Sequence, residues 1–105
     1  MTAFLDVPGA SGARYRFRRA DAGGELPVNA GNFVAVTEER NARRYLACGT
    51  ARSLARAAPA IREALGKGRG AALFIRLNVS RAVRDAEHDD IVAAVAPARS
   101  FEDLG

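Results

Sequence analysis

Several residue types that often carry chemistry or stability are scarce in this chain. Its 105 residues include no tryptophan, one cysteine, one histidine and one methionine. A single cysteine excludes an internal disulfide, which fits a reducing cytoplasm. One cysteine and one histidine also cannot build the usual zinc sites of Cys and His ligands, so we expect no bound metal.

Long apolar runs are absent as well. No stretch approaches the ~20 apolar residues that a helix needs to cross a bilayer. The start, "MTAFLDVPGASG", has neither the basic region nor the apolar core of a signal peptide. We therefore expect a cytoplasmic protein without a membrane partner. A hydrophobic fraction of 49% and a charged fraction of 27% suit one folded domain spanning residues 1–105.

Charge is abundant but unevenly placed. The net charge is +4, and all but one of the basic residues are arginine. Residues 1–84 carry 15 basic and 6 acidic side chains, whereas residues 85–105 carry 1 basic and 6 acidic ones. The planar guanidinium group of arginine can donate two hydrogen bonds to a phosphate, so the composition is compatible with phosphate binding. The codon usage of a GC-rich genome explains the same composition, and composition alone favours that second explanation.

The hydrophobic pattern predicts a small α+β domain with a mostly antiparallel sheet and helices packed on it. The expected elements, in order, are a strand at 13–20, a hairpin of strands at 32–37 and 43–49, a helix from about Thr50 to Leu65, a strand at 71–79 and a helix at 81–96. The core is expected over about 13–97. The tail, 98–105, is expected to be loose apart from Phe101 and Leu104.

Local signals refine these elements. Both hairpin strands are apolar on both faces, as at the centre of a covered sheet. Pro59 predicts a kink or a break in the first helix, because proline inside a helix costs ~3 kcal/mol. Ser80 is expected to cap the second helix, which Pro97 stops.

Cys48 has two interpretations. A thiol at a helix N-terminus near arginines can be activated as a nucleophile. Such a nucleophile usually needs a base, and the only histidine, His88, lies on the other helix. A free thiol is also a small apolar side chain that suits a central strand. We favour the buried, structural interpretation.

Two other patterns are weak. "GKGRG" at 66–70 could contact a phosphate, but it follows a helix and opens a strand, unlike a phosphate-binding P-loop. Four acids on the second helix could suggest a Mg²⁺ site: Asp85, Glu87, Asp89 and Asp90. They point in several directions along the helix, so a solvated face is a simpler explanation. Glu87 lies nearer the apolar side, and we expect an arginine from the sheet to pair with it.

The order of elements resembles the GIY-YIG nucleases. "GNFVAV", from Gly31, stands where the first motif strand of that family would be, and "ACGT", with Gly49, stands where the second would end. The resemblance covers roughly Gly31 to Pro97. It implies a hairpin, a helix that carries an arginine, a third strand and a helix that carries a metal-binding glutamate.

The resemblance also implies that the catalytic set is lost. Phe33 and Ala47 occupy the places of the two tyrosines, and Ala57 that of the arginine, with Arg56 one residue early. The glutamate position belongs to His88, with Glu87 one step before it. Without tyrosine hydroxyls to orient water, metal-assisted cleavage of a phosphodiester is not expected.

Three hypotheses follow. The first is a non-catalytic GIY-YIG-like domain that binds DNA or RNA weakly and without sequence preference, through Arg14, Arg16, Arg18, Arg52 and Arg56. The second is a module that binds a protein partner or a second copy through the acidic C-terminal helix. The third is a residual nuclease that uses Arg56, Glu87 and His88. No cofactor or small-molecule ligand is indicated.

Overall fold

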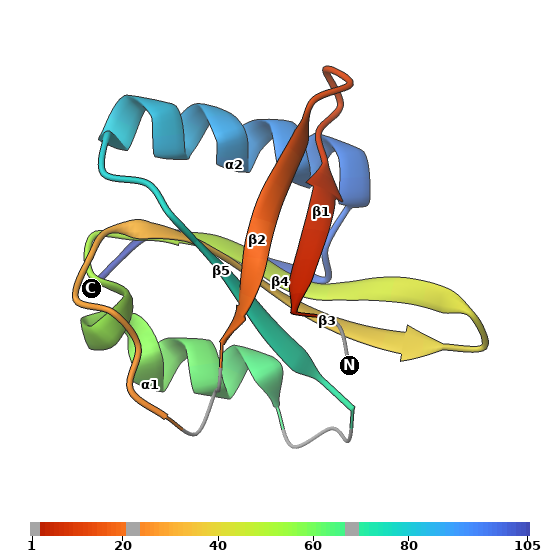
Figure 1. Ribbon diagram of the computed structural model, residues 1–105, viewed down its shortest axis with the longest axis horizontal. Helices are drawn as coiled ribbons and strands as arrows, with labels where there is room; N and C mark the ends of the chain where they lie inside the picture. Colours follow the sequence, from red (N-terminus) through yellow and green to blue (C-terminus); the bar gives the residue numbers. More distant parts are fainter. Residues whose placement is uncertain (1–2, 21–23, 67–69) are drawn as a thin grey trace.

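The computed structural model describes residues 3–20, 24–66 and 70–105. The predicted stretch "GKGRG" therefore lies largely outside the described residues. The elements within them are β1 (Phe4–Pro8), β2 (Arg14–Ala20), β3 (Gly31–Glu39), β4 (Ala42–Ala51), α1 (Leu54–Leu65), β5 (Ala72–Leu77), α2 (Arg81–Val95) and β6 (Arg99–Leu104). The predicted α+β class is confirmed, and Figure 1 shows the arrangement.

The strands form one sheet in the order β1-β2-β5-β3-β4-β6. The pairs β1–β2, β2–β5, β5–β3 and β3–β4 are antiparallel, but β4 and β6 run parallel. The sheet is therefore mixed, and the predicted series of strands is incomplete at both ends. β5 lies between β2 and β3, so a strand from late in the sequence joins the two hairpins.

The hairpin of β3 and β4 was predicted, and both strands are longer than expected. Only Arg40 and Asn41 separate them, and both have positive φ, 51° and 67°. Positive φ at both central residues matches the type I′ turn that suits a twisted hairpin. The register shifts between Ala35 and Val36, where Leu46 is the extra residue on β4.

α1 is one continuous helix, so the break, one of the two alternatives predicted at Pro59, does not occur. Ser53 caps the helix, since its side chain accepts a hydrogen bond from the Arg56 N–H. The side chain of Pro59 is exposed. Pro59 therefore lies on the side of α1 that faces water, where a proline is tolerated more easily.

α2 begins after Ser80, whose side chain accepts a hydrogen bond from the Val83 N–H, as predicted. It ends at Val95, and Ala96 takes the left-handed conformation just before Pro97. The residues that α2 buries are Arg84, His88 and Ile91. The sheet-facing side of this helix is thus partly polar.

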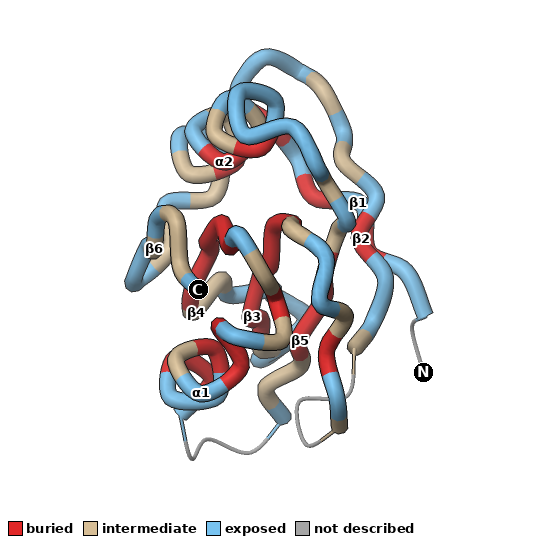
Figure 2. Tube along the Cα trace, turned by 90° about the vertical axis from the view of Figure 1, so that its left-hand side faces the viewer, coloured by how far each residue is buried: buried red, intermediate tan, exposed pale blue. Residues whose placement is uncertain are grey.

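The sheet separates two apolar clusters. α1 packs on one face, where the cluster includes Phe33, Ala35, Leu73 and Ile75. The other face carries a second cluster with Val34, Val36, Phe74 and, from α2, Ile91, besides Leu5, Val7 and Phe17 of the curled β1–β2 edge. Figure 2 shows α1 and α2 on opposite sides of β3, β4 and β5. The expectation that the hairpin is apolar on both faces is confirmed.

The predicted core of 13–97 is too short, and the prediction of a loose tail is wrong. The outermost strands, β1 and β6, lie on either side of that range and belong to the sheet. β6 pairs with β4, and the Asp103 N–H donates to the Thr50 hydroxyl at 2.8 Å. Phe101 packs against Phe33, with ring centroids 6.2 Å apart. β1 pairs with β2 and buries Leu5 and Val7. Both strands are short and only partly apolar, so pairing with a neighbour, rather than local pattern, makes them strands.

Candidate functional site

The positions identified through the GIY-YIG resemblance do not share one site. Phe33, Ala47 and Ala57 are buried in the cluster beneath α1. Glu87 and His88 lie on α2, across the sheet. Three positions therefore form part of a packed core, and the two acid or base candidates lie on the other face.

Gly49, which would end the second motif strand, has a packing role. It pairs with Phe33 across the hairpin, and a Cβ added at Gly49 would collide with the Phe33 ring. The same Cβ would approach Phe101 to 3.1 Å. Glycine is thus required here because two aromatic side chains close over the backbone.

Cys48 is buried in the second cluster, as predicted, with 1% of its surface exposed. Burial raises the pKa of its thiol to about 12. Since the thiolate is the reactive form, this cysteine is a core side chain and not an activated nucleophile.

Glu87 lies at the centre of a polar network between α2 and the sheet. Its carboxylate accepts hydrogen bonds from Arg76 Nε at 2.8 Å and from Asn78 Nδ2 at 3.0 Å. Asn78 also donates to Asn32, which donates in turn to the Arg84 carbonyl. The predicted pairing of Glu87 with an arginine of the sheet is confirmed. The carboxylate holds α2 to β5 and to Asn78, and the bonds of Asn32 extend the network to β3.

Arg56 lies far from this network in the fold. It is exposed on α1, on the opposite side of the sheet from Glu87. His88 is buried, which lowers its pKa, while nearby Glu102 and Asp89 act to raise it. The structure thus provides no common site for Arg56, Glu87 and His88, the residues that a residual nuclease would use.

The three arginines of β2 share one exposed face. Tyr15 and Phe17 point into the second cluster, so Arg14, Arg16 and Arg18 point the other way, and all three are exposed. Among the described residues, the cluster beneath α1 contains no side chain of β1 and only Ala20 of β2. This part of the sheet is therefore left uncovered by α1 (Figure 2).

We call this surface the open face and define it by Phe4, Arg14, Arg16, Arg18 and Leu77. Phe4 and Leu77 expose 53% and 48% of their surface. The Arg16 guanidinium lies 5.2 Å from the centroid of the Phe4 ring. Its Nε is 3.3 Å from Asp6. Among the described residues, no carboxylate pairs with Arg14 or Arg18.

Two shallow grooves follow the open face. One is lined by Phe4, Arg16, Arg18 and Leu77, and the next shares Arg18 and continues to Pro27. The Pro27 carbonyl accepts a hydrogen bond from the Ala55 N–H at the start of α1. The segment around Pro27 thus connects the arginines of β2 with the first turn of α1.

Arg52 and Arg56 stand beyond that segment, in a separate hollow with Val28. Arg52 also lies 3.6 Å from Asp103, which approaches Arg81 at 3.5 Å. The five predicted arginines therefore form two groups, and Asp103 reduces the charge of the second.

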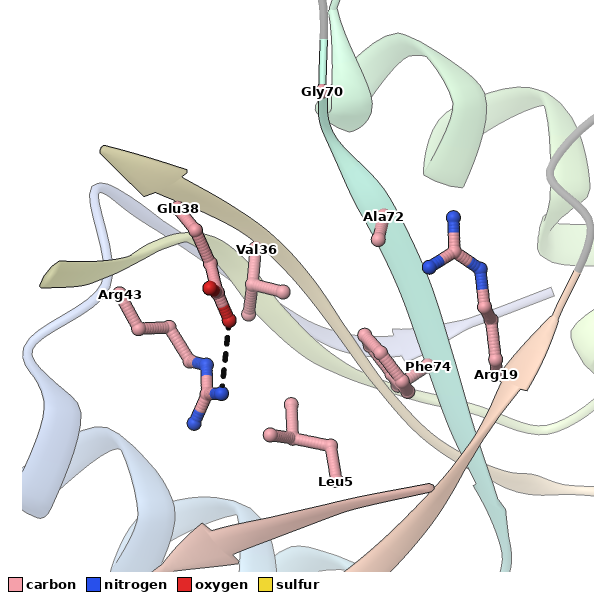
Figure 3. A pocket seen from close by; sticks show the side chains of 8 residues that line it. All are labelled: Leu5, Arg19, Val36, Glu38, Arg43, Gly70, Ala72 and Phe74. Atoms are coloured by element: carbon pink, nitrogen blue, oxygen red, sulfur yellow. Dashed lines mark hydrogen bonds and ion pairs between the residues drawn. The ribbon is translucent and has the colours of Figure 1, made fainter. Parts of the chain in front are cut away.

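A further hollow opens on the α2 side of the sheet. Leu5, Val36, Ala72 and Phe74 form its apolar floor, and Arg19 and Arg43 stand on opposite sides of it (Figure 3). Arg43 is paired with Glu38 at 3.0 Å. Gly70 also lines the hollow.

Sequence reasoning missed Phe4, although "FLDVP" alternates in the manner of a strand. It anticipated an arginine beside Glu87 without identifying Arg76, and it missed Asn78 and Asn32. In comparisons with protein-family models, curated proteins and solved structures, no match to this chain is found.

Proposed function

We propose that this protein is a non-catalytic module that binds DNA or RNA weakly through the open face. The observation that carries the proposal is the row of Arg14, Arg16 and Arg18 on an uncovered part of the sheet, two of them without a carboxylate partner among the described residues. The likeness to GIY-YIG nucleases stays a prediction, and the proposal does not depend on it.

The chemistry of the open face suits a polyanion. Alternate residues of a strand lie about 6.6 Å apart, which is close to the spacing of phosphates along an extended single strand. Each neutralised phosphate releases counterions, and this release supplies most of non-specific affinity. Phe4 adds an exposed ring beside a guanidinium, a pairing on which any base can stack.

Binding of this kind carries little sequence preference. Phosphate contacts position a nucleic acid without reading its bases, and stacking accepts every base. We expect a dissociation constant of order 10⁻⁴–10⁻⁶ M at physiological salt. The logarithm of affinity should fall steeply with the logarithm of salt, by about 0.9 per duplex phosphate contacted.

Fluorescence anisotropy of labelled single-stranded and duplex oligonucleotides tests this, with salt varied between roughly 50 and 200 mM. The double variant Arg16→Ala with Arg18→Ala should bind more weakly and show a shallower salt slope. Arg40→Asn with Arg44→Ala removes the same charge from the exposed end of the hairpin and should leave binding nearly unchanged. Asparagine is used at position 40 because it tolerates positive φ.

Two outcomes contradict the proposal. The first is no binding at the lowest salt concentration. The second is an equal loss in both double variants, because that would show a response to net charge and not to the open face.

A second function is favoured by a different observation. Val79, just before the acidic helix α2, and Val83, in its first turn, expose 80% and 47% of their surface. Exposed apolar side chains on a helix whose later turns carry Asp85, Asp89 and Asp90 suit a protein partner with a basic and apolar surface, including the basic part of a second copy. Sedimentation at increasing concentration tests self-association, which Val79→Thr with Val83→Thr should weaken.

A further inference from the structure

A separate group of side chains lies between α2 and β6, and we call it the α2–β6 cluster. It consists of His88, Asp89 and Glu102. One possible ligand atom from each residue, a ring nitrogen or a carboxylate oxygen, lies within 4.8 Å of the others. Asp89 and Glu102 are exposed, and His88 exposes only 3% of its surface.

His88 is the unusual member. Among the described residues, no hydrogen bond or ion pair engages its imidazole ring. Buried polar side chains in folded proteins nearly always have a partner, because losing water without compensation is unfavourable. Here the imidazole belongs to a residue that exposes only 3% of its surface, it has no hydrogen-bond partner in the described part of the chain, and it faces two carboxylates.

We propose that the α2–β6 cluster binds a divalent transition metal ion of the zinc type. One imidazole and two carboxylates form a mixed nitrogen and oxygen donor set, which suits such an ion better than Mg²⁺ or Ca²⁺, whose ligands are almost all oxygen. Two carboxylates also balance the two positive charges of the ion. The absence of a Cys and His zinc motif does not exclude this site, since carboxylate oxygens are zinc ligands too.

The geometry needs only small side-chain movements. In a tetrahedral zinc site with bonds of about 2.0 Å, neighbouring ligand atoms are about 3.3 Å apart. The exposed carboxylates of Asp89 and Glu102 can approach the ring by rotation, while His88 stays fixed by packing. Three protein ligands leave a further position for water. Bound metal would hold the edge strand β6 against α2.

The chain offers a direct probe of this site because it has a single histidine. Without a polyhistidine tag, the imidazole resonances in a ¹H–¹⁵N spectrum belong to His88 alone. We expect Zn²⁺ to shift the coordinating ring nitrogen and to saturate at one ion per chain in calorimetry. Mg²⁺ should produce neither effect.

Surface variants keep the test independent of folding. Glu102→Gln and Asp89→Asn replace exposed carboxylates, and each should weaken Zn²⁺ binding by about tenfold or more. Glu63→Gln changes an exposed acid on α1, across the sheet, and should bind like the parent chain. The proposal is overturned if Zn²⁺ leaves the His88 resonances unmoved, or if Glu102→Gln and the control bind Zn²⁺ with equal affinity.

Discussion

At the scale of single residues, burial decides the chemistry of Cys48. The pKa of its thiol rises from 9.0 to about 12 because the charged form is desolvated. In the native protein, alkylation by iodoacetamide should therefore stay slow and nearly constant across the pH range in which a free thiol ionises. In denaturant, the rate should instead rise with a midpoint near 9. Fast labelling of the native chain would contradict this prediction.

The same shift has a consequence for stability. The native thiol keeps its proton above pH 9, whereas the unfolded thiol loses it. The contribution of Cys48 to stability is therefore present below about pH 9 and is lost as the pH rises towards 12. Cys48→Ala should lose less stability over this range than the parent chain, as measured by urea unfolding.

The close packing around Gly49 leads to a second prediction at this scale. Gly49→Ala should destabilise the protein by about 1–3 kcal/mol, because the new methyl group meets the Phe33 ring in a packed core. The cost should be smaller when Phe33 is already leucine, since a smaller side chain leaves room. Urea unfolding of the two single variants and the double variant measures this coupling. Equal costs in both backgrounds would contradict the packing explanation.

At the scale of elements, the Glu87 network joins α2 to β5. Glu87→Gln should cost about 1.5–3 kcal/mol, the range for hydrogen bonds to charged groups. Asp85→Asn is the matched control, because it breaks the exposed pair with Arg81 on the same helix. Such pairs contribute about 0.3–0.5 kcal/mol. Urea midpoints compare the two variants, and equal losses would show that Glu87 is an ordinary surface acid.

The elements that could be predicted from the sequence are those with strong local patterns. Leu54, Ala58, Ile61 and Leu65 have helical spacing, and all four are buried in α1. β6 has only Phe101 and Leu104 as apolar residues and becomes a strand because β4 lies beside it. Of the two outcomes predicted at Pro59, the break does not occur, because the cost of a proline depends on which side of the helix faces water.

At the scale of the whole molecule, the two cores share their strands. β3 and β5 supply alternate side chains to both clusters, so losing one core exposes the other. We predict a single cooperative transition. Both tyrosines pack against the second cluster, and there is no tryptophan, so tyrosine fluorescence reports on that core. Its urea transition should coincide with that of far-ultraviolet circular dichroism. An earlier fluorescence transition would show that the cores unfold separately.

The candidate interface could be predicted only in part, because the sequence shows local alternation but not the order of strands in the sheet. The alternation in β2 places Arg14, Arg16 and Arg18 on one face whatever the fold. Whether that face is covered depends on the strand order, which places β1 and β2 beyond α1. The α2–β6 cluster could not be predicted from the sequence either, because the pairing of β6 with β4 is what places Glu102 near His88.

The parallel pairing of β6 with β4 also bears on how fast the chain folds. The hairpins β1–β2 and β3–β4 close over short loops and can form early. β6 reaches β4 only after the chain has passed through α1, β5 and α2. Closing so long a loop costs entropy before any contact compensates it, and such non-local pairing slows folding. The docking of β6 should therefore come late, and Phe33 and Gly49 should stay accessible until the last strand arrives.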